Sequence, residues 1–317
     1  MKNNLVKIFL NVFLIYFFLF VHLKAQEPFN FDIAELEIIN DGNTIIGKNG
    51  GTAYTKDKTL EISAENFKYD KLQNTLYAKN KVTIRDLQKN IKIFTDHIIY
   101  LKNQEIIFTK SRSTATDDNT TIHGDRFEYQ KSNQLLIALG DVEVIDKINQ
   151  YNIKARKISY DLTKEIIETT GKTTAYIQSK YIFKSKDVIL FKKTMELMSN
   201  KKSIIEDDNS SIYKLKKFRY QIKEKILNGE NIEVITNNLQ EKSDKFYFSN
   251  GIFNFLKKKF IAKDTKILLH KTLFDNDREK IEEENEENKK KFNFKGKNDP
   301  RISGVSSFGN NESIIIN

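Results

Sequence analysis

Residues 125–145 read DRFEYQKSNQLLIALGDVEVI, and this stretch shows the pattern that decides the fold. Phe127 and Tyr129 lie two residues apart with the charged Glu128 between them, which is the period of a β-strand with one buried face. The next residues, QKSN, are typical of a turn, and a second apolar run begins at Leu135. The stretch therefore predicts two strands joined by a turn.

The same pattern recurs seven times, at intervals of about thirty residues, between Glu65 and Lys271. Three columns of residues are apolar or aromatic in all seven units, although only 39% of the chain is hydrophobic. The columns are Phe67, Ile98, Phe127, Ile158, Val188, Phe218 and Phe246; then Tyr69, Tyr100, Tyr129, Tyr160, Leu190, Tyr220 and Phe248; and then Leu76, Ile107, Leu136, Ile167, Leu197, Leu227 and Phe255.

Repeats of this length stack on their neighbours because a single unit cannot bury its apolar face alone. With about two strands in each unit, we predict an all-β fold over residues 26–271. It is an elongated β-jellyroll, or β-taco, of about fourteen antiparallel strands in two facing sheets. The three columns face one interior, whereas Lys68, Glu128 and Arg219 face water. The end of such a stack has unpaired backbone that a partner strand can cover.

The composition excludes several kinds of site. Cysteine is absent, so the chain has no disulfide, thiolate metal site or redox pair. The sequence also lacks a nucleophile elbow, a P-loop and a dinucleotide-binding motif. His123 and Asp125 could offer two metal ligands, but such a pair is more typical of a surface turn. We therefore expect no enzyme activity, no cofactor and no metal.

The two ends of the chain differ from the repeats. Lys2 and Lys7 form a short basic region before an apolar run at residues 8–21. Together with the small residue Ala25, this pattern predicts a signal peptide over residues 1–25. An uncleaved membrane anchor is the alternative. Residues 272–297 are highly charged and predict a solvated linker. Residues 298–317 form a further segment that ends on three isoleucines.

The repeat resembles the organic-solvent-tolerance, or OstA-like, domain family of the lipopolysaccharide transport proteins of Gram-negative bacteria. The residues that carry the resemblance are DRFEY at 125–129, repeated in register, and GDVEV at 140–144. The tail NDPRISGVSS at 298–307 is similar to the segment that precedes the barrel in LptD, the outer-membrane assembly protein. The chain is thus most similar to the amino-terminal periplasmic portion of LptD, although no barrel follows and the cysteines of LptD are absent.

The resemblance implies a protein of the periplasm, associated with the outer membrane, that holds lipopolysaccharide acyl chains in an apolar groove. Its implied partners are lipopolysaccharide and other jellyroll proteins of the transport bridge, joined by edge-strand pairing. The residues expected to line the groove are Phe67, Tyr69, Leu76, Ile98, Tyr100, Ile107, Phe127, Tyr129, Leu136, Ile158, Tyr160, Ile167, Phe218 and Tyr220.

Three other functions remain open. One is a bridge protein of the same pathway, similar to LptA or LptC. Another is a secreted structural or adhesive β-repeat protein whose closed core holds no lipid. The net charge of +10 with interleaved tyrosine and phenylalanine also suggests a nucleic-acid binder, but an exported protein meets no such target, so we expect no nucleic-acid partner.

The N-terminal segment gives the first testable prediction. Signal peptidase is expected to cleave after Ala25 on export, because the basic start, apolar run and small residue match its substrates. Mass spectrometry of the exported protein should find Gln26 at the N-terminus. Recovery of a chain that begins at Met1 or Lys2 would contradict the prediction and favour an anchor.

Overall fold

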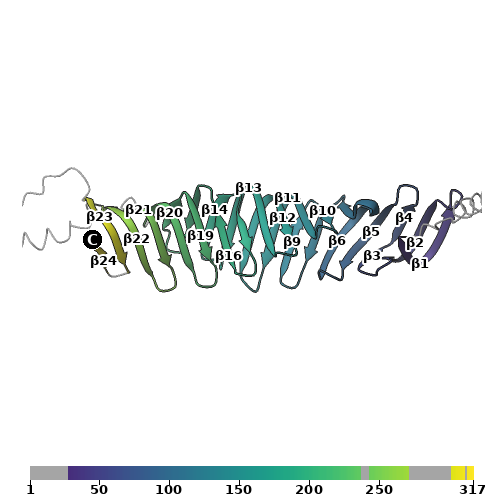
Figure 1. The fold of residues 1–317 in the computed structure, drawn as a ribbon, viewed down its shortest axis with the longest axis horizontal. Helices are drawn as coiled ribbons and strands as arrows, with labels where there is room; N and C mark the ends of the chain where they lie inside the picture. Colours follow the sequence, from purple (N-terminus) through teal and green to yellow (C-terminus); the bar gives the residue numbers. More distant parts are fainter. Residues whose placement is uncertain (1–27, 237–242, 271–300, 311–312) are drawn as a thin grey trace, which may run out of the picture.

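The computed structural model describes residues 28–236, 243–270, 301–310 and 313–317. These residues form an elongated roll in which strands lie side by side along one long axis, from β1 at one end to β24 at the other (Figure 1). The prediction of an all-β antiparallel fold is confirmed. In the described residues the helical structure is a 3-10 turn, Lys102–Gln104, and no helix there is long and apolar enough to cross a membrane.

The described strands fall into two length classes. Those of nine residues or more are β1 (Phe29–Ile39), β2 (Thr44–Thr55), β5 (Thr75–Asp86), β6 (Ile91–Leu101), β11 (Leu135–Asp146), β12 (Tyr151–Asp161), β13 (Ile166–Ile177), β20 (Ile226–Ile235), β21 (Lys245–Asn254), β22 (Lys259–Leu268) and β23 (Arg301–Gly309). The shorter ones are β3 (Leu60–Ala64), β4 (Asn66–Asp70), β7 (Ile106–Thr109), β8 (Ser113–Thr116), β9 (Thr120–Gly124), β10 (Arg126–Gln130), β14 (Tyr181–Lys186), β15 (Ile189–Phe191), β16 (Glu196–Ser199), β17 (Ser203–Glu206), β18 (Ile212–Leu215), β19 (Lys217–Gln221) and β24 (Ile314–Ile316).

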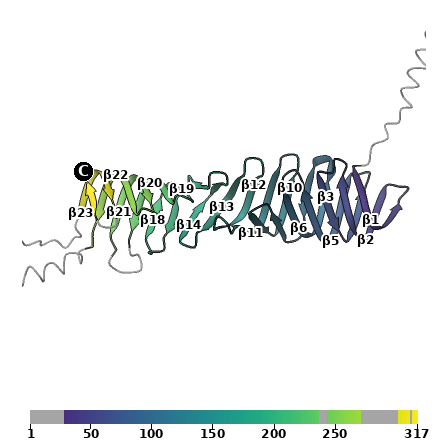
Figure 2. The ribbon, with the colours of Figure 1, turned by 90° about the horizontal axis from the view of Figure 1, so that it is seen from below.

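The pairing of these strands defines two sheets. Each long strand lies partly in one sheet and partly in the other, as β5 does by pairing with β4 through one half and with β3 through the other. Sheet I contains β4, β7, β10, β15, β16, β19 and β24, and sheet II contains β3, β8, β9, β14, β17 and β18, each together with halves of the long strands. We call the line where strands pass between the sheets the spine, and the opposite side, where the turns lie, the mouth. Figure 2 shows the row of strands after a quarter turn.

The spine requires an irregular backbone. The register of β5 against β6 shifts between Lys79 and Val82, and Asn80 and Lys81 there have φ angles of 65° and 50°. The matching position in β11 is Gly140, with φ of 99°. A Cβ atom at Gly140 would lie 2.1 Å from a carboxylate oxygen of Asp125. Glycine is therefore favoured at this position of β11, whereas asparagine occupies the matching position of β5.

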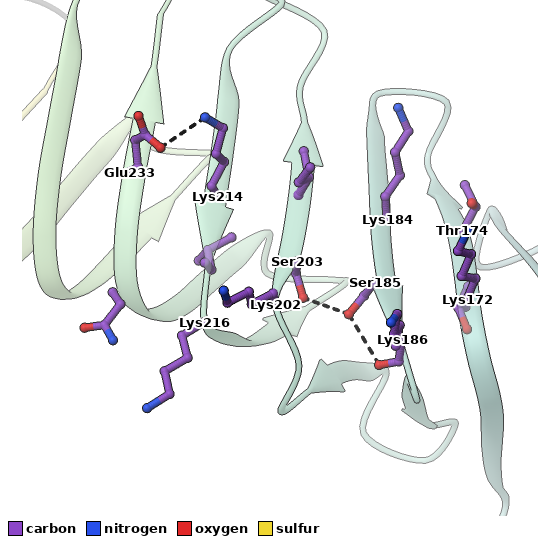
Figure 3. A pocket seen from close by; sticks show the side chains of 14 residues that line it. Lys172, Thr174, Lys184, Ser185, Lys186, Lys202, Ser203, Lys214, Lys216 and Glu233 are labelled. Carbon is purple, nitrogen blue, oxygen red and sulfur yellow. Dashed lines mark hydrogen bonds and ion pairs between the residues drawn. The ribbon is translucent and has the colours of Figure 1, made fainter.

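Buried hydroxyl groups line the inner side of the spine. Thr169 bonds to Thr173 over 2.7 Å, and Ser185 bonds to Ser203 over 2.8 Å (Figure 3). Further along the roll, Thr265 donates to Ser307 over 2.6 Å. These hydroxyl groups satisfy one another's hydrogen bonds inside the roll.

The strand count differs from the prediction, because the described residues contain 24 strands rather than about fourteen. Two causes account for the difference. At the spine the chain often breaks its backbone pairing with the neighbouring strand. A segment that passes from one sheet to the other is then divided into two short strands, such as β3 and β4. In addition, β1 and β2 precede the first unit, and β23, from the tail segment, pairs with β22 and extends the roll.

The predicted inward and outward faces are confirmed. Nineteen of the twenty-one column residues are buried, and Phe246 and Phe255 are partly buried against the same core cluster. Lys68 and Arg219 are exposed, and Glu128 is half-buried. Strict alternation along each strand therefore gives one continuous apolar interior.

This alternation gives a prediction for two neighbouring residues of β11. Leu136→Ala removes a fully buried side chain and should lower the free energy of unfolding by about 2–5 kcal/mol, measured by chemical denaturation. Ile137→Ala, on the half-buried outer face, should cost about 1 kcal/mol. Equal losses for the two variants would contradict the assigned faces.

Candidate functional site

The apolar interior is the first part of the candidate site. The structure brings all fourteen predicted lining residues into one buried cluster, each with 3% or less of its surface exposed. They come from the first four units and the sixth, and the same buried cluster includes Val188, Leu190 and Leu197 of the fifth, so the lining is continuous along the roll. Their side chains are packed against one another as a core.

Aromatic rings continue this lining toward the C-terminal end of the roll. Tyr181 stacks on Phe255 with ring centroids 5.0 Å apart, and Phe183 lies 4.9 Å from Tyr220. Phe253 stacks on Phe260 at 5.7 Å. Of these residues, only Tyr220 was among the predicted lining residues. Tyr181, Phe183, Phe253 and Phe260 were missed because they lie outside the three columns, whereas Phe255 belongs to the third column but was not among the predicted lining residues.

The mouth is the second part of the site, and polar side chains close it. The Tyr129 hydroxyl, on a sheet I strand, donates a hydrogen bond of 2.6 Å to Asp86 at a sheet II turn. The Tyr160 hydroxyl donates in the same way to Asp117 over 2.7 Å. Lys192 lies 2.6 Å from the same oxygen of Asp117. We call these and the similar pairs across the two sheets the mouth contacts.

The mouth contacts follow the repeat. Tyr129 and Tyr160 each lie 43 residues after their aspartate, and Tyr100 lies equally far after Asp57. Asp57 instead meets Lys131, at 4.0 Å. Two further contacts lie along the mouth: Lys89 donates to the Thr163 hydroxyl over 3.3 Å, and Gln178 donates to the Ile222 carbonyl over 3.4 Å.

Asp86 and Asp117 each use their two carboxylate oxygens for different contacts. In Asp86 the Oδ1 atom accepts backbone N–H groups of its own turn, from Gln88 and Lys89, while Oδ2 accepts the Tyr129 hydroxyl. Asp117 divides its oxygens in the same way. The next aspartate, Asp146, uses both oxygens on Asn149. The tyrosine column holds Leu190 in the next unit, so Asp146 has no column tyrosine at the spacing of the other pairs.

Burial and hydrogen bonding set the charges at the mouth. Burial alone would raise the pKa of Asp117, but the hydrogen bonds from Lys192 and Tyr160 outweigh it and hold that pKa below its ordinary value. Burial and the bond to Asp117 raise the pKa of Tyr160. The hydrogen bond from the Thr55 hydroxyl, with those from Thr59, lowers the pKa of Asp57 to about 2. Asp57 and Asp117 are therefore ionised at neutral pH and Tyr160 is neutral.

Edge strands at both ends form the third part of the site. Among the described residues, β1 pairs with β2 alone and β24 pairs with β23 alone. On β1, Leu36 and Ile38 are exposed. Each end therefore offers backbone N–H and C=O groups to a further strand.

A basic depression of about 750 Å3 lies beside the spine, lined by exposed lysines and by the buried Thr173, Ser185, Ser203 and Leu215 (Figure 3). Its lysines are Lys172, Lys184, Lys186, Lys202, Lys214 and Lys216. Lys184 pairs with Glu206 at 2.6 Å, and Lys214 pairs with Glu233 at 3.1 Å. The other four have no ion pair within the described part of the chain. The depression faces away from the mouth and gives that side a positive charge.

The described residues place no group of three or more acidic, histidine or cysteine side chains where a metal could bind. His123, one half of the pair considered from the sequence, bonds to the Thr114 hydroxyl over 3.0 Å. The predicted signal peptide and linker lie outside the described residues.

Comparison with known proteins gives one family match. Residues 22–144 match the model of a family described as lipopolysaccharide-assembly, LptC-related. This range contains the mouth aspartates Asp57, Asp86 and Asp117. No curated protein matches the chain. Among solved structures, a crystal structure of LptH from Pseudomonas aeruginosa is described as the LptA-homologous periplasmic component of the lipopolysaccharide transport device. It is 9% identical, with a TM-score of 0.22, and the match covers 45% of this chain and 82% of that one. A similarity at that level carries no argument about function.

The contact of Asp117 with Lys192 gives a prediction for stability. Asp117→Asn leaves a largely buried ammonium group without its carboxylate, and should lower the free energy of unfolding by about 2 kcal/mol at pH 7. Because the folded-state pKa of Asp117 lies below its ordinary value, its stabilisation is present above the unfolded-state pKa and is lost as the pH falls through the folded-state pKa. The difference between wild type and variant in chemical denaturation should therefore disappear at low pH.

The control for this prediction is Asp96→Asn, at an exposed position of β6. It should change the free energy of unfolding by less than about 0.5 kcal/mol. Equal effects of the two variants, or a difference that persists at low pH, would show that Asp117 does not hold the mouth through its charge.

Proposed function

We propose that this chain carries lipopolysaccharide through the periplasm as a component of a transport bridge, with the acyl chains inside the roll. The single observation that carries the proposal is the apolar interior, which is continuous over the repeat units and closed on one side by the mouth contacts. The match of residues 22–144 to the LptC-related family supports it. No chemical step is part of this function.

Lipid can enter only if the two sheets separate at the mouth, because the fourteen lining residues are packed together. Each hydrogen bond across the mouth contributes about 1 kcal/mol of net free energy. Burial of an acyl chain contributes about 0.8 kcal/mol for each methylene group. The free energy gained by burying an acyl chain of about a dozen methylenes therefore exceeds the free energy of several mouth contacts. The acyl chain also packs against the apolar side chains that lose contact with one another when the sheets separate.

The ends of the roll suit a place within a chain of similar proteins. A partner strand added to β1 or β24 would continue the ladder and the apolar interior together. At β1, the exposed Leu36 and Ile38 would become covered in the same step. We propose that other jellyroll proteins of the bridge bind at these edges.

The LptC-related match favours a bridge protein over the LptD-like role in outer-membrane assembly to which the tail pointed. The strand β23 from that tail extends the roll rather than beginning a separate part. A structural protein with a closed, lipid-free core is the second candidate, and the tight packing of the interior is the observation in its favour.

Photo-crosslinking tests the proposal. A photoreactive phenylalanine analogue in place of Tyr220, which is fully buried, should trap lipopolysaccharide in cells. The same analogue in place of Tyr176, which is 40% exposed on the outer side of β13, should trap little. If a folded protein traps no lipid at Tyr220, the interior is only a core and the structural candidate is correct.

A covalent link across the mouth distinguishes lipid that passes through the interior from lipid that binds to the outer surface. The chain has no cysteine, so Lys89→Cys with Thr163→Cys provides a unique pair for a short bis-maleimide across the mouth. The link should abolish crosslinking of lipid at Tyr220. The control pair is Glu143→Cys with Lys154→Cys, which face each other within sheet II, and joining them should leave lipid crosslinking unchanged.

A further inference from the structure

A row of four exposed apolar side chains crosses the outer face of sheet I at its C-terminal end. Ile252 lies opposite Ile261, Ile261 opposite Phe308, and Phe308 opposite Ile315, so the row passes over β21, β22, β23 and β24. Their exposed fractions are 50%, 60%, 43% and 55%. We call this set the apolar row.

The apolar row is separate from the interior and from the strand edges. On the same strands, Phe253 and Ala262 point inward and are buried, so the row belongs to the opposite face. A further strand added to β24 would cover backbone at the edge but leave this face open. The partner of the apolar row is therefore not the partner of the edge.

Unpaired lysines surround the apolar row. Lys259 and Lys263 are exposed on β22 on either side of Ile261. Lys257 and Lys258 lie in the preceding turn beside Leu256, which is 63% exposed. None of these four lysines has an ion pair with a described residue. The row thus combines an apolar centre with a cationic border.

We propose that this surface docks on an anionic lipid bilayer, with the apolar row entering the headgroup region and the lysines contacting lipid phosphates. The side-chain types decide between lipid and protein. Protein interfaces are enriched in Tyr, Trp, Phe, Met and Arg and depleted in Lys. Of these enriched types the apolar row has only Phe308, beside three isoleucines, and Lys borders it. Aliphatic residues with lysine beside them match an interfacial membrane surface, because lysine extends its charge to the headgroups while its stem covers apolar surface.

The geometry suits shallow contact. Four neighbouring strands spaced about 4.8 Å apart carry the row over about 14 Å, and its side chains stand on one face of the sheet. Each lysine near an anionic surface strengthens binding by about fivefold, and salt screens this gain. Docking here would hold the C-terminal end of the roll against a membrane while the interior and the edges stay free.

A single tryptophan reports the contact, because the chain has none. Phe308→Trp places the reporter in the apolar row, and Phe94→Trp places it on the outer face of sheet II, where Phe94 is 42% exposed. Both are made in the full chain, so the apolar run at residues 8–21 is common to both. With vesicles of phosphatidylglycerol and phosphatidylcholine, emission from position 308 should shift to the blue and be quenched by brominated acyl chains. Emission from position 94 should not change.

The tryptophan at position 308 also tests the role of the lysine charges. Lys259→Gln with Lys263→Gln should weaken binding to these vesicles by roughly twenty-five-fold, and vesicles of phosphatidylcholine alone should give little shift. The proposal is overturned if position 308 gives no shift, if position 94 shifts equally, or if position 308 shifts with protein concentration without vesicles, which would show contact between copies. Each of these results leaves the crosslinking at Tyr220 unaffected, so this inference and the proposed function fail separately.

Discussion

The bend at the spine is the constraint on which the rest of the structure depends. Every strand that crosses from one sheet to the other must keep its apolar side chains inward on both sides of the bend. In β5 the inward residues flanking the bend are Ala78 and Val82, whereas in the paired β6 they are Thr95 and Ile98. One strand therefore needs an extra residue at the bend. Left-handed backbone at Asn80 and Lys81 accommodates it.

The sequence predicted the features that arise within one unit. The spacing of Phe127 and Tyr129 indicated a half-buried strand, and the structure places both inside. The position of the spine was not predictable in the same way, because Lys81 adopts a positive φ that is typical of glycine or asparagine. As a result, the number of strands was underestimated although their faces were correct.

The mouth was missed for a different reason. Asp86 and Tyr129 are 43 residues apart, which is longer than one repeat, so a comparison of units in register does not bring them together. A search for aspartates at a constant distance before the tyrosine column would have found Asp57, Asp86 and Asp117. The apolar row was missed because Ile261 and Phe308 are adjacent only after the tail segment joins the sheet.

The long sequence distance of the mouth contacts also affects how the roll responds to force or heat. In a simple stack each unit touches its nearest neighbours, and one unit can melt almost independently of distant ones. Here Asp117 joins Tyr160 and Lys192, which belong to later units that are themselves 32 residues apart. Separation of the sheets at one place therefore loosens contacts in two other units. The two sheets are therefore expected to separate over several neighbouring units at once, and this open region can move along the mouth from unit to unit.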